Sequence, residues 1–240
     1  MAIIKFDNVS LKYPIYNNRN LSFRNQLLRL STGGIIESEA GKMNYVTALN
    51  NVNFEINEGD FIGLVGHNGA GKTTLLRTMA GIYTPNSGTI TKEGITSTLF
   101  EQGACMEIEL SGYENIIRMC QIYGLSKKEA FSKISDIEDF TELGEFLNLP
   151  VRTYSTGMSM RLSFAVATAI APEILLIDEI FGAGDQAFRE KANKRLSKII
   201  NSSKIFVFAS HSMDLIKKYC NKIFLLNHGN IEIKNISFIK

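Results

Sequence analysis

The chain has 240 residues, of which 45% are hydrophobic and 21% are charged, and these values suit one globular domain with a full core. The net charge of +2 at pH 7 gives no global reason to expect nucleic acid or an anionic membrane as a partner. Cys105, Cys120 and Cys220 lie far apart without CxxC spacing. We therefore expect buried or idle thiols rather than a metal site or a disulfide framework.

The N-terminal sequence has charged residues at Lys5 and Asp7 and leaves no room for the apolar region of a signal peptide. The longest apolar stretch, residues 164–171, is far shorter than the ~20 residues that span a bilayer. We expect a chain that does not cross a membrane, so any membrane role would come from a partner.

Short apolar runs alternate with helical patterns, which predicts an α/β fold with a mainly parallel sheet. The clearest strands lie at residues 61–65, 174–177 and 205–209. They are apolar without alternation, as expected of strands that are covered on both faces. A helix is predicted from Lys72 to about Ala80, ended by Gly81.

The sequence changes character between residues 103 and 160, where helices are predicted at 112–123, 127–138 and 141–147. We interpret 103–160 as a helical subdomain inserted into an α/β core of residues 1–102 and 161–240, all within a single domain, 1–240. Residues 223–233 predict a hairpin, an antiparallel β element. The segment 17–44 forms either a basic amphipathic helix or an elaborated surface loop.

Residues 66–74, GHNGAGKTT, match the phosphate-loop pattern G-x-x-x-x-G-K-[ST] between a predicted strand and a predicted helix. The glycines let backbone N–H groups surround phosphate oxygens, and the helix directs its positive end at the same anion. Lys72 suits the β- and γ-phosphates, Thr73 suits Mg²⁺, and Thr74 can donate to a phosphate. A tight glycine turn is the alternative, which this placement disfavours. We predict that ATP binds to Gly66, His67, Asn68, Gly69, Ala70, Gly71, Lys72, Thr73 and Thr74.

Two carboxylates, Asp178 and Glu179, follow the apolar strand 174–177. Asp178 suits holding Mg²⁺ through water, and Glu179 suits activating the attacking water as a general base. His211 follows the strand 205–209 and could contact the γ-phosphate, although a packing or capping role is the alternative. The imidazoles of His67 and His228 are assigned no separate role.

Residues 154–162, YSTGMSMRL, resemble the ABC signature LSGGQxxR, with Ser155, Gly157 and Arg161 at matching positions. A Ser hydroxyl and Gly N–H groups at the start of a helix form a second anion site. One chain cannot place both anion sites on one ATP. The resemblance therefore implies a homodimer with ATP at its interface.

The resemblance to ABC ATPases extends over the chain and implies a P-loop, RecA-like fold with further site residues. Asp185 matches the acidic position of the D-loop, and His211 matches the switch histidine. Tyr13, or alternatively Tyr16, would stack on adenine. Gln102, or alternatively Glu101, would fill the Q-loop position. The implied catalytic residues are Glu179, His211, Gln102 and Lys72, and the implied Mg²⁺ ligands are Thr73, Gln102 and Asp178.

The chain departs from the usual ABC motifs at Thr156, Met158 and Ile180. These departures, with FEQGA, LSGYEN and DEIFGAGDQAF, resemble the ATPases that export bacterial surface polysaccharides. That resemblance implies a lipid-linked cargo such as O-antigen, capsule or teichoic acid, and a separate transmembrane permease, through which the chain would associate with the cytoplasmic face of the bacterial inner membrane. The alternatives are another cargo, such as a lipid or drug, and an ABC-type ATPase that serves no transporter. An unrelated P-loop kinase or GTPase is disfavoured by the signature.

Overall fold

The structure, a computed structural model, describes residues 1–15, 35–37, 44–99, 106–178 and 186–236. The chain divides into two compact units. Unit 1 comprises Met1–Thr96, Leu176–Glu179 and Lys204–Lys240, and unit 2 comprises Ser97–Leu175 and Ile180–Ser203. Unit 2 therefore extends beyond residues 103–160, the helical subdomain predicted from the sequence, and that division of the chain stays a prediction.

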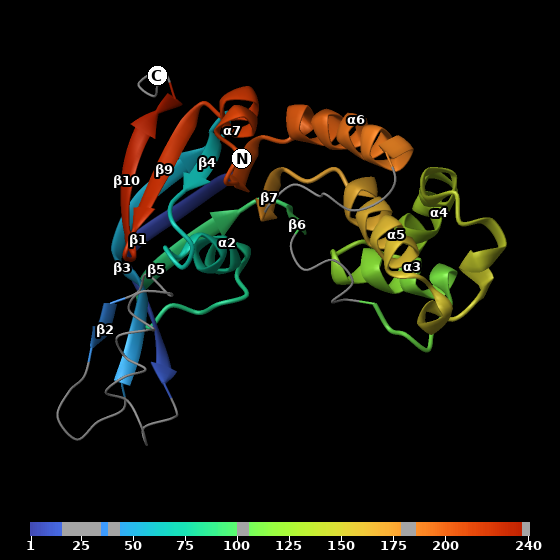
Figure 1. Cartoon of the computed structure of the whole chain (residues 1–240), viewed down its shortest axis with the longest axis horizontal. Coiled ribbons are helices and arrows are strands. Elements are labelled where there is room, and N and C mark those ends of the chain that lie inside the picture. The colour runs from blue at the N-terminus through green and yellow to red at the C-terminus, as the bar shows by residue number, and fades with distance from the viewer. Residues whose placement is uncertain (16–34, 38–43, 100–105, 179–185, 237–240) are drawn as a thin grey trace. The chain divides into compact units, whose positions relative to one another are not determined.

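Unit 1 contains an antiparallel sheet with the strand order β2-β3-β1-β5. Its strands are β1 (Ile3–Ile15), β2 (Ile35–Glu37), β3 (Asn44–Asn57) and β5 (Ser87–Glu93), and β1 pairs with both β3 and β5 (Figure 1). The stacked rings of Phe6 and Phe54, with centroids 4.5 Å apart, help to fill its buried face. β2 falls within the segment 17–44. Residues 35–37 are thus a strand and Asn44 begins β3, whereas the rest of the segment, for which a helix or a surface loop was predicted, lies outside the described residues.

The second sheet has the strand order β10-β9-β4-β8-β7-β6. Its strands are β4 (Phe61–Val65), β6 (Thr96–Leu99), β7 (Ile174–Asp178), β8 (Ile205–Ala209), β9 (Lys222–Asn227) and β10 (Asn230–Asn235). β4 pairs in parallel with β8 and β9. The α/β fold and the three strands predicted from unbroken apolar runs are confirmed.

The C-terminal hairpin of unit 1 is also confirmed, because β9 and β10 pair antiparallel. The turn residues His228 and Gly229 both have positive φ, at 47° and 79°. Positive φ at two successive residues is the conformation of a tight hairpin turn whose twist matches the strands.

Two helices in unit 1 each have one terminus at a residue suited to capping it. α2 (Lys72–Ala80) ends at Gly81, whose φ of 85° lets its N–H reach back to the carbonyl of Thr78. The helix predicted from the sequence is thus confirmed. α7 (Met213–Tyr219) is capped by Ser212, whose side chain accepts from the N–H of Leu215.

Unit 2 contains α3 (Gly112–Ile122), α4 (Lys127–Thr141), α5 (Thr156–Ala169) and α6 (Gln186–Ser202), with 3-10 helices at Gly144–Asn148 and Val151–Thr153. α3 and α4 confirm two predicted helices, but a third α-helix over 141–147 was wrong. Glu142 and Gly144 have positive φ, at 55° and 50°, and this left-handed backbone ends an α-helix. Only a short 3-10 helix follows.

α3 and α4 both begin with a capping box. Ser111 accepts from the N–H of Glu114, whose side chain accepts in return from the N–H of Ser111. Ser126 and Glu129 repeat this arrangement at α4. Each box satisfies two backbone donors that the first turn of a helix leaves unpaired.

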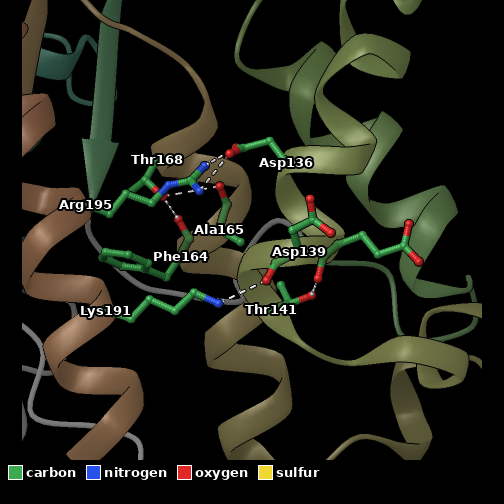
Figure 2. A network of polar contacts seen from close by, with 9 residues as sticks. Asp136, Asp139, Thr141, Phe164, Ala165, Thr168, Lys191 and Arg195 are labelled. Carbon is green, nitrogen blue, oxygen red and sulfur yellow. Dashed lines mark hydrogen bonds and ion pairs between the residues drawn. The ribbon is translucent and has the colours of Figure 1, made fainter.

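Cationic side chains on α6 attach it to α4 within unit 2 (Figure 2). The guanidinium group of Arg195 forms an ion pair with Asp136 and lies 4.5 Å from the ring centroid of Phe140. Lys191 Nζ donates to the carbonyl oxygen of Asp139 at 3.0 Å. Because each cation has a polar partner on α4 and also lies over the ring of Phe140, these side chains join the two helices without leaving a buried charge unpaired.

None of the helices in the described ranges combines the length and the apolar character that crossing a membrane requires. Cys120 and Cys220 are free and buried, and burial raises the pKa of the Cys220 thiol to about 12. Both are in the thiol form at neutral pH, which makes them poor nucleophiles.

Candidate functional site

The loop between β4 and α2 is packed so closely that two of its glycines cannot be replaced without displacing backbone. A Cβ on Gly66 would lie 2.6 Å from the carbonyl oxygen of Leu226 on β9. A Cβ on Gly71 would lie 2.9 Å from the carbonyl oxygen of Ala48 on β3, and Gly71 has a φ of 105°. The loop is therefore held between strands of both sheets of unit 1, and its shape depends on glycine.

Lys72, the first residue of α2, is buried and directs its ammonium group back at the loop. Nζ donates to the carbonyl oxygens of Gly66, at 2.7 Å, and His67, at 3.2 Å. The cation thus lies beside the N-terminal end of α2, where the backbone N–H groups also favour negative charge. Ala70 contributes to the same compact turn through its N–H, which donates to His67.

A cavity of about 600 Å³ opens beside this loop in unit 1. This volume is within the range of small-molecule and cofactor sites. It brings together residues from five separate parts of the chain, namely Tyr13, Val46, Thr47, Ala48, Asn68, Gly69, Gly71, Lys72, Thr73, Thr74, Asp178 and His211. Asp178 at the end of β7 and His211 just after β8 thus reach the same pocket as the loop, because the carboxyl ends of neighbouring parallel strands lie at one edge of a sheet.

Tyr13 forms part of the pocket wall through contacts at both ends of its side chain. Its hydroxyl donates to Thr74 Oγ1 at 3.4 Å, and its ring meets Tyr83 edge-on with centroids 5.8 Å apart. Burial raises the pKa of Tyr13, so the phenol is neutral at physiological pH. A neutral aromatic ring at the pocket wall can stack on a heterocyclic base. The alternative residue, Tyr16, lies outside the described residues.

The donor atoms in the pocket suit a magnesium nucleotide. The Thr73 hydroxyl and the Asp178 carboxylate are hard oxygen donors, which Mg²⁺ prefers. Within the described ranges no group of three or more His, Cys, Asp or Glu residues gathers to hold a metal. A site with one or two protein oxygens is nevertheless usual for Mg²⁺, because substrate phosphates and water supply the other ligands.

Ser155 and Gly157 lie in unit 2, at the start of α5. The exposed Ser155 caps the helix, and its Oγ accepts from the N–H of Met158 at 3.3 Å. A Cβ on Gly157 would meet only Ser155 Oγ, at 3.9 Å. The exposed hydroxyl of Ser155 and the N-terminal end of α5 form a site that suits an anion.

Three of the residues assigned from the sequence, Gln102, Glu179 and Asp185, lie outside the described residues. Three others that line the pocket, Val46, Thr47 and Ala48 on β3, were not anticipated. They carry no charge and follow no motif. Their place depends on the pairing of β3 with β1, which residues 44–57 alone do not reveal.

A glycine loop between a strand and a helix, a lysine at the helix start and a carboxylate at the end of a parallel strand define a P-loop nucleotide-binding site. The sequence profile described as "ABC transporter" matches residues 49–182, more than half of the chain. The chain therefore belongs to the ATP-binding proteins of the ABC transporter family, as its signature indicated, and it is an ATPase of that class.

Several curated proteins resemble this chain over 95% or more of its length. It is 62% identical over 231 residues to the O-antigen export system ATP-binding protein RfbE of Yersinia enterocolitica, covering 96% of this chain and 97% of that protein. It is 38% identical to the O-antigen export system ATP-binding protein RfbB of Myxococcus xanthus, covering 96% and 52%. It is 36% identical to the teichoic acids export ATP-binding protein TagH of Bacillus anthracis, covering 95% and 40%. The chain thus spans nearly all of the first relative and about half or less of the other two.

Solved structures show the same fold. A dimeric ATP-binding cassette in a post-hydrolysis state, bound to ADP and phosphate, aligns with a TM-score of 0.69 and 22% identity, over 97% of this chain and 98% of that one. An ATP-binding subunit of an ABC transporter aligns with a TM-score of 0.70 and 19% identity, over 98% and 90%. These likenesses establish the ABC cassette fold for the chain.

Proposed function

We propose that this ATPase drives the export of a lipid-linked surface polysaccharide of the O-antigen type. Export would proceed through a separate transmembrane permease, to which the ATPase binds at the cytoplasmic face of the bacterial inner membrane. The observation that carries the proposal is the 62% identity to an O-antigen export ATP-binding protein over 96% of this chain. The same cargo class was implied by the motifs YSTGMSMRL, FEQGA and LSGYEN.

ATP binds in the cavity of unit 1, with its phosphates in the loop of residues 66–74 and its adenine against Tyr13. Lys72 neutralises the phosphates, and the compact loop orients them through its N–H groups. Thr73, Asp178 and Gln102 hold Mg²⁺, which when bound neutralises charge on the β- and γ-phosphates. The loop residues His67, Asn68 and Ala70 contribute to phosphate binding through their backbone.

Glu179 accepts a proton from the attacking water, a role that typically contributes about 10²–10⁴ in rate. Its position in the chain, immediately after Asp178 at the end of β7, supports this role. His211 hydrogen-bonds the γ-phosphate from the adjacent strand β8, and Gln102 orients the water. The placement of His211 in the pocket lining supports the first of these contacts.

The second half of each ATP site comes from another copy of the chain, through Ser155, Gly157 and Asp185. The exposed Ser155 at the start of α5 supports this arrangement, since its hydroxyl and the helix N-terminus suit a phosphate. Two copies related by a twofold axis would enclose two ATP molecules and bury both.

The permease contacts unit 2 through exposed apolar side chains. Ile108 and Phe146 are 56% and 50% exposed, and Leu149 is also exposed. Backbone hydrogen bonds from Val151 and Arg152 to Leu110 and Ile108 hold the two segments that carry these side chains side by side. Apolar surface of this kind marks protein interaction sites.

Deleting the gene from its host, followed by complementation, tests the proposal. We expect the deletion to remove the surface polysaccharide and to leave its lipid-linked form inside the cell. Wild-type protein should restore display, whereas Lys72→Ala should not. Unchanged polysaccharide display together with loss of another exported lipid or drug would favour a different cargo. Normal export of every cargo would favour an ATPase that serves no transporter.

A further inference from the structure

Tyr154 directly precedes Ser155. Its hydroxyl contacts two other segments of unit 2. The hydroxyl donates to the carbonyl oxygen of Phe146 at 2.7 Å. It also lies against Gly112, the first residue of α3, so closely that a Cβ on Gly112 would overlap the hydroxyl oxygen. The hydroxyl thus fixes the distance between the start of α5 and two other segments of unit 2.

The segments that meet at Tyr154 are joined in turn by backbone hydrogen bonds. Ser111 forms a bridge with Pro150, and the N–H of Val151 donates to Leu110 at 3.0 Å. The N–H of Tyr154 donates to the carbonyl oxygen of Val151 at 2.9 Å. Residues 108–111 and 146–154 therefore behave as one junction that ends at Ser155.

This junction connects the two functional surfaces of unit 2. Ile108 and Phe146 expose their side chains on it, and Phe146 also supplies the carbonyl oxygen that Tyr154 binds. Ser155 follows Tyr154 by a single peptide bond, so a rotation of the tyrosine backbone moves the serine hydroxyl. A displacement of residues 146–150 by a bound partner would reach Ser155 through the Tyr154 side chain as well as through the backbone hydrogen bond between Tyr154 and Val151.

We infer that Tyr154 is a positioning residue, which holds Ser155 where it can reach the phosphate of an ATP bound by a second copy and links Ser155 to the apolar surface at Ile108 and Phe146. This inference rests on the proposed role of Ser155. Desolvation, with a smaller effect of Tyr113, raises the pKa of Tyr154. The phenol therefore remains a hydrogen-bond donor at physiological pH.

The test uses Tyr154→Phe, which keeps the ring and removes the hydroxyl. Its matched control is Tyr113→Phe, because Tyr113 also lies in unit 2 and its hydroxyl donates to Glu138 at 3.0 Å. Both changes are made in a Glu179→Gln chain, in which the proposed loss of the general base should slow the consumption of ATP. Sedimentation velocity then measures dimerisation against ATP concentration, and equilibrium dialysis with labelled ATP measures binding by the monomer.

We expect Tyr154→Phe to weaken ATP-dependent dimerisation by about 5–20-fold, since one hydrogen bond is lost and Ser155 is released. Binding of ATP to the monomer and the thermal midpoint should match those of Tyr113→Phe, which should dimerise like the parent chain. Equal dimerisation by the two variants would overturn the inference. Failure of the parent chain to dimerise with ATP would instead contradict the proposed composite site.

A second substitution approaches the same contact from α3. Gly112→Ala places a methyl group at the Tyr154 hydroxyl and should also weaken dimerisation. In the double variant Gly112→Ala, Tyr154→Phe the overlap with the hydroxyl is removed, while the close approaches of the methyl group to Leu147 Cδ2, at 2.9 Å, and Leu147 Cα, at 3.0 Å, remain. The two losses should therefore still be less than additive. Fully additive losses would show that the two residues act separately and would contradict the inference.

Discussion

The carbonyl oxygen of Ala48 on β3 lies 2.9 Å from the position that a Cβ on Gly71 would take. This close approach joins the antiparallel sheet directly to the residue that precedes α2. Gly71 also has a φ of 105°, which only glycine adopts without strain. The shape of the phosphate loop is therefore fixed by a strand that shares no motif with it.

Gly71→Ala should therefore weaken ATP binding by at least about tenfold and lower the free energy of unfolding by about 1–3 kcal/mol. Isothermal titration with ATP and urea denaturation measure the two effects. The control is Gly124→Ala, because Gly124 has a φ of 91° but no atom within 4 Å of its Cβ position. Gly124→Ala should lower the free energy of unfolding but leave ATP affinity unchanged. Unchanged ATP affinity in Gly71→Ala would contradict the packing argument.

Lys72→Ala should weaken both ATP binding and turnover, because the ammonium group lies inside the loop, 2.7 Å from the carbonyl oxygen of Gly66. Removing a charge-assisted contact to phosphate should reduce affinity by about 10–100-fold. A filter-binding assay with labelled ATP measures it. Lys204→Ala, at an exposed ion pair with Glu58, should bind ATP normally. If Lys72→Ala bound and hydrolysed ATP like wild type, the proposed contact of Lys72 with the phosphates would be wrong.

The sequence predicts the parts of the fold that depend on local patterns. The strands at 61–65 and 205–209 are unbroken apolar runs, and the helix at 72–80 ends at a glycine, so all three were identified. The pairing of β1 with β3 and β5 joins residues far apart in the chain and has no local signal. For the same reason Val46 and Thr47 were not recognised as pocket residues. The prediction of an α-helix over 141–147 was wrong because Glu142 adopts a left-handed backbone, which cannot be predicted from its residue type.

The capping box at α4 predicts a loss of stability in acid. Hydrogen bonds from the Ser126 side chain and backbone hold the pKa of Glu129 below its usual value. Since the folded pKa is lowered, the stabilisation is present above the unfolded pKa of about 4.3 and is lost as pH falls through the folded value. Glu129→Gln should therefore be less stable than wild type at pH 7, and urea titrations should show this difference shrinking as the pH falls below about 4.3.

The control for the acid prediction is Glu232→Gln, an exposed carboxylate on β10 outside any helix cap. Its stability relative to wild type should change less with pH than that of Glu129→Gln. A constant difference between Glu129→Gln and wild type from pH 7 to pH 3 would contradict the assigned ionic role of the capping box.

We propose that each ATP is bound by the loop of one chain and by Ser155 of another, and is hydrolysed with Glu179 as the base. The most direct measurement is sedimentation velocity of the Glu179→Gln chain with ATP and Mg²⁺, followed by an assay of the nucleotide that the protein retains. We predict that hydrolysis falls by about 10²-fold or more and that the chain sediments as a dimer with unhydrolysed ATP bound. A Glu179→Gln chain that remains monomeric in saturating ATP, or that hydrolyses ATP at the wild-type rate, would contradict the account.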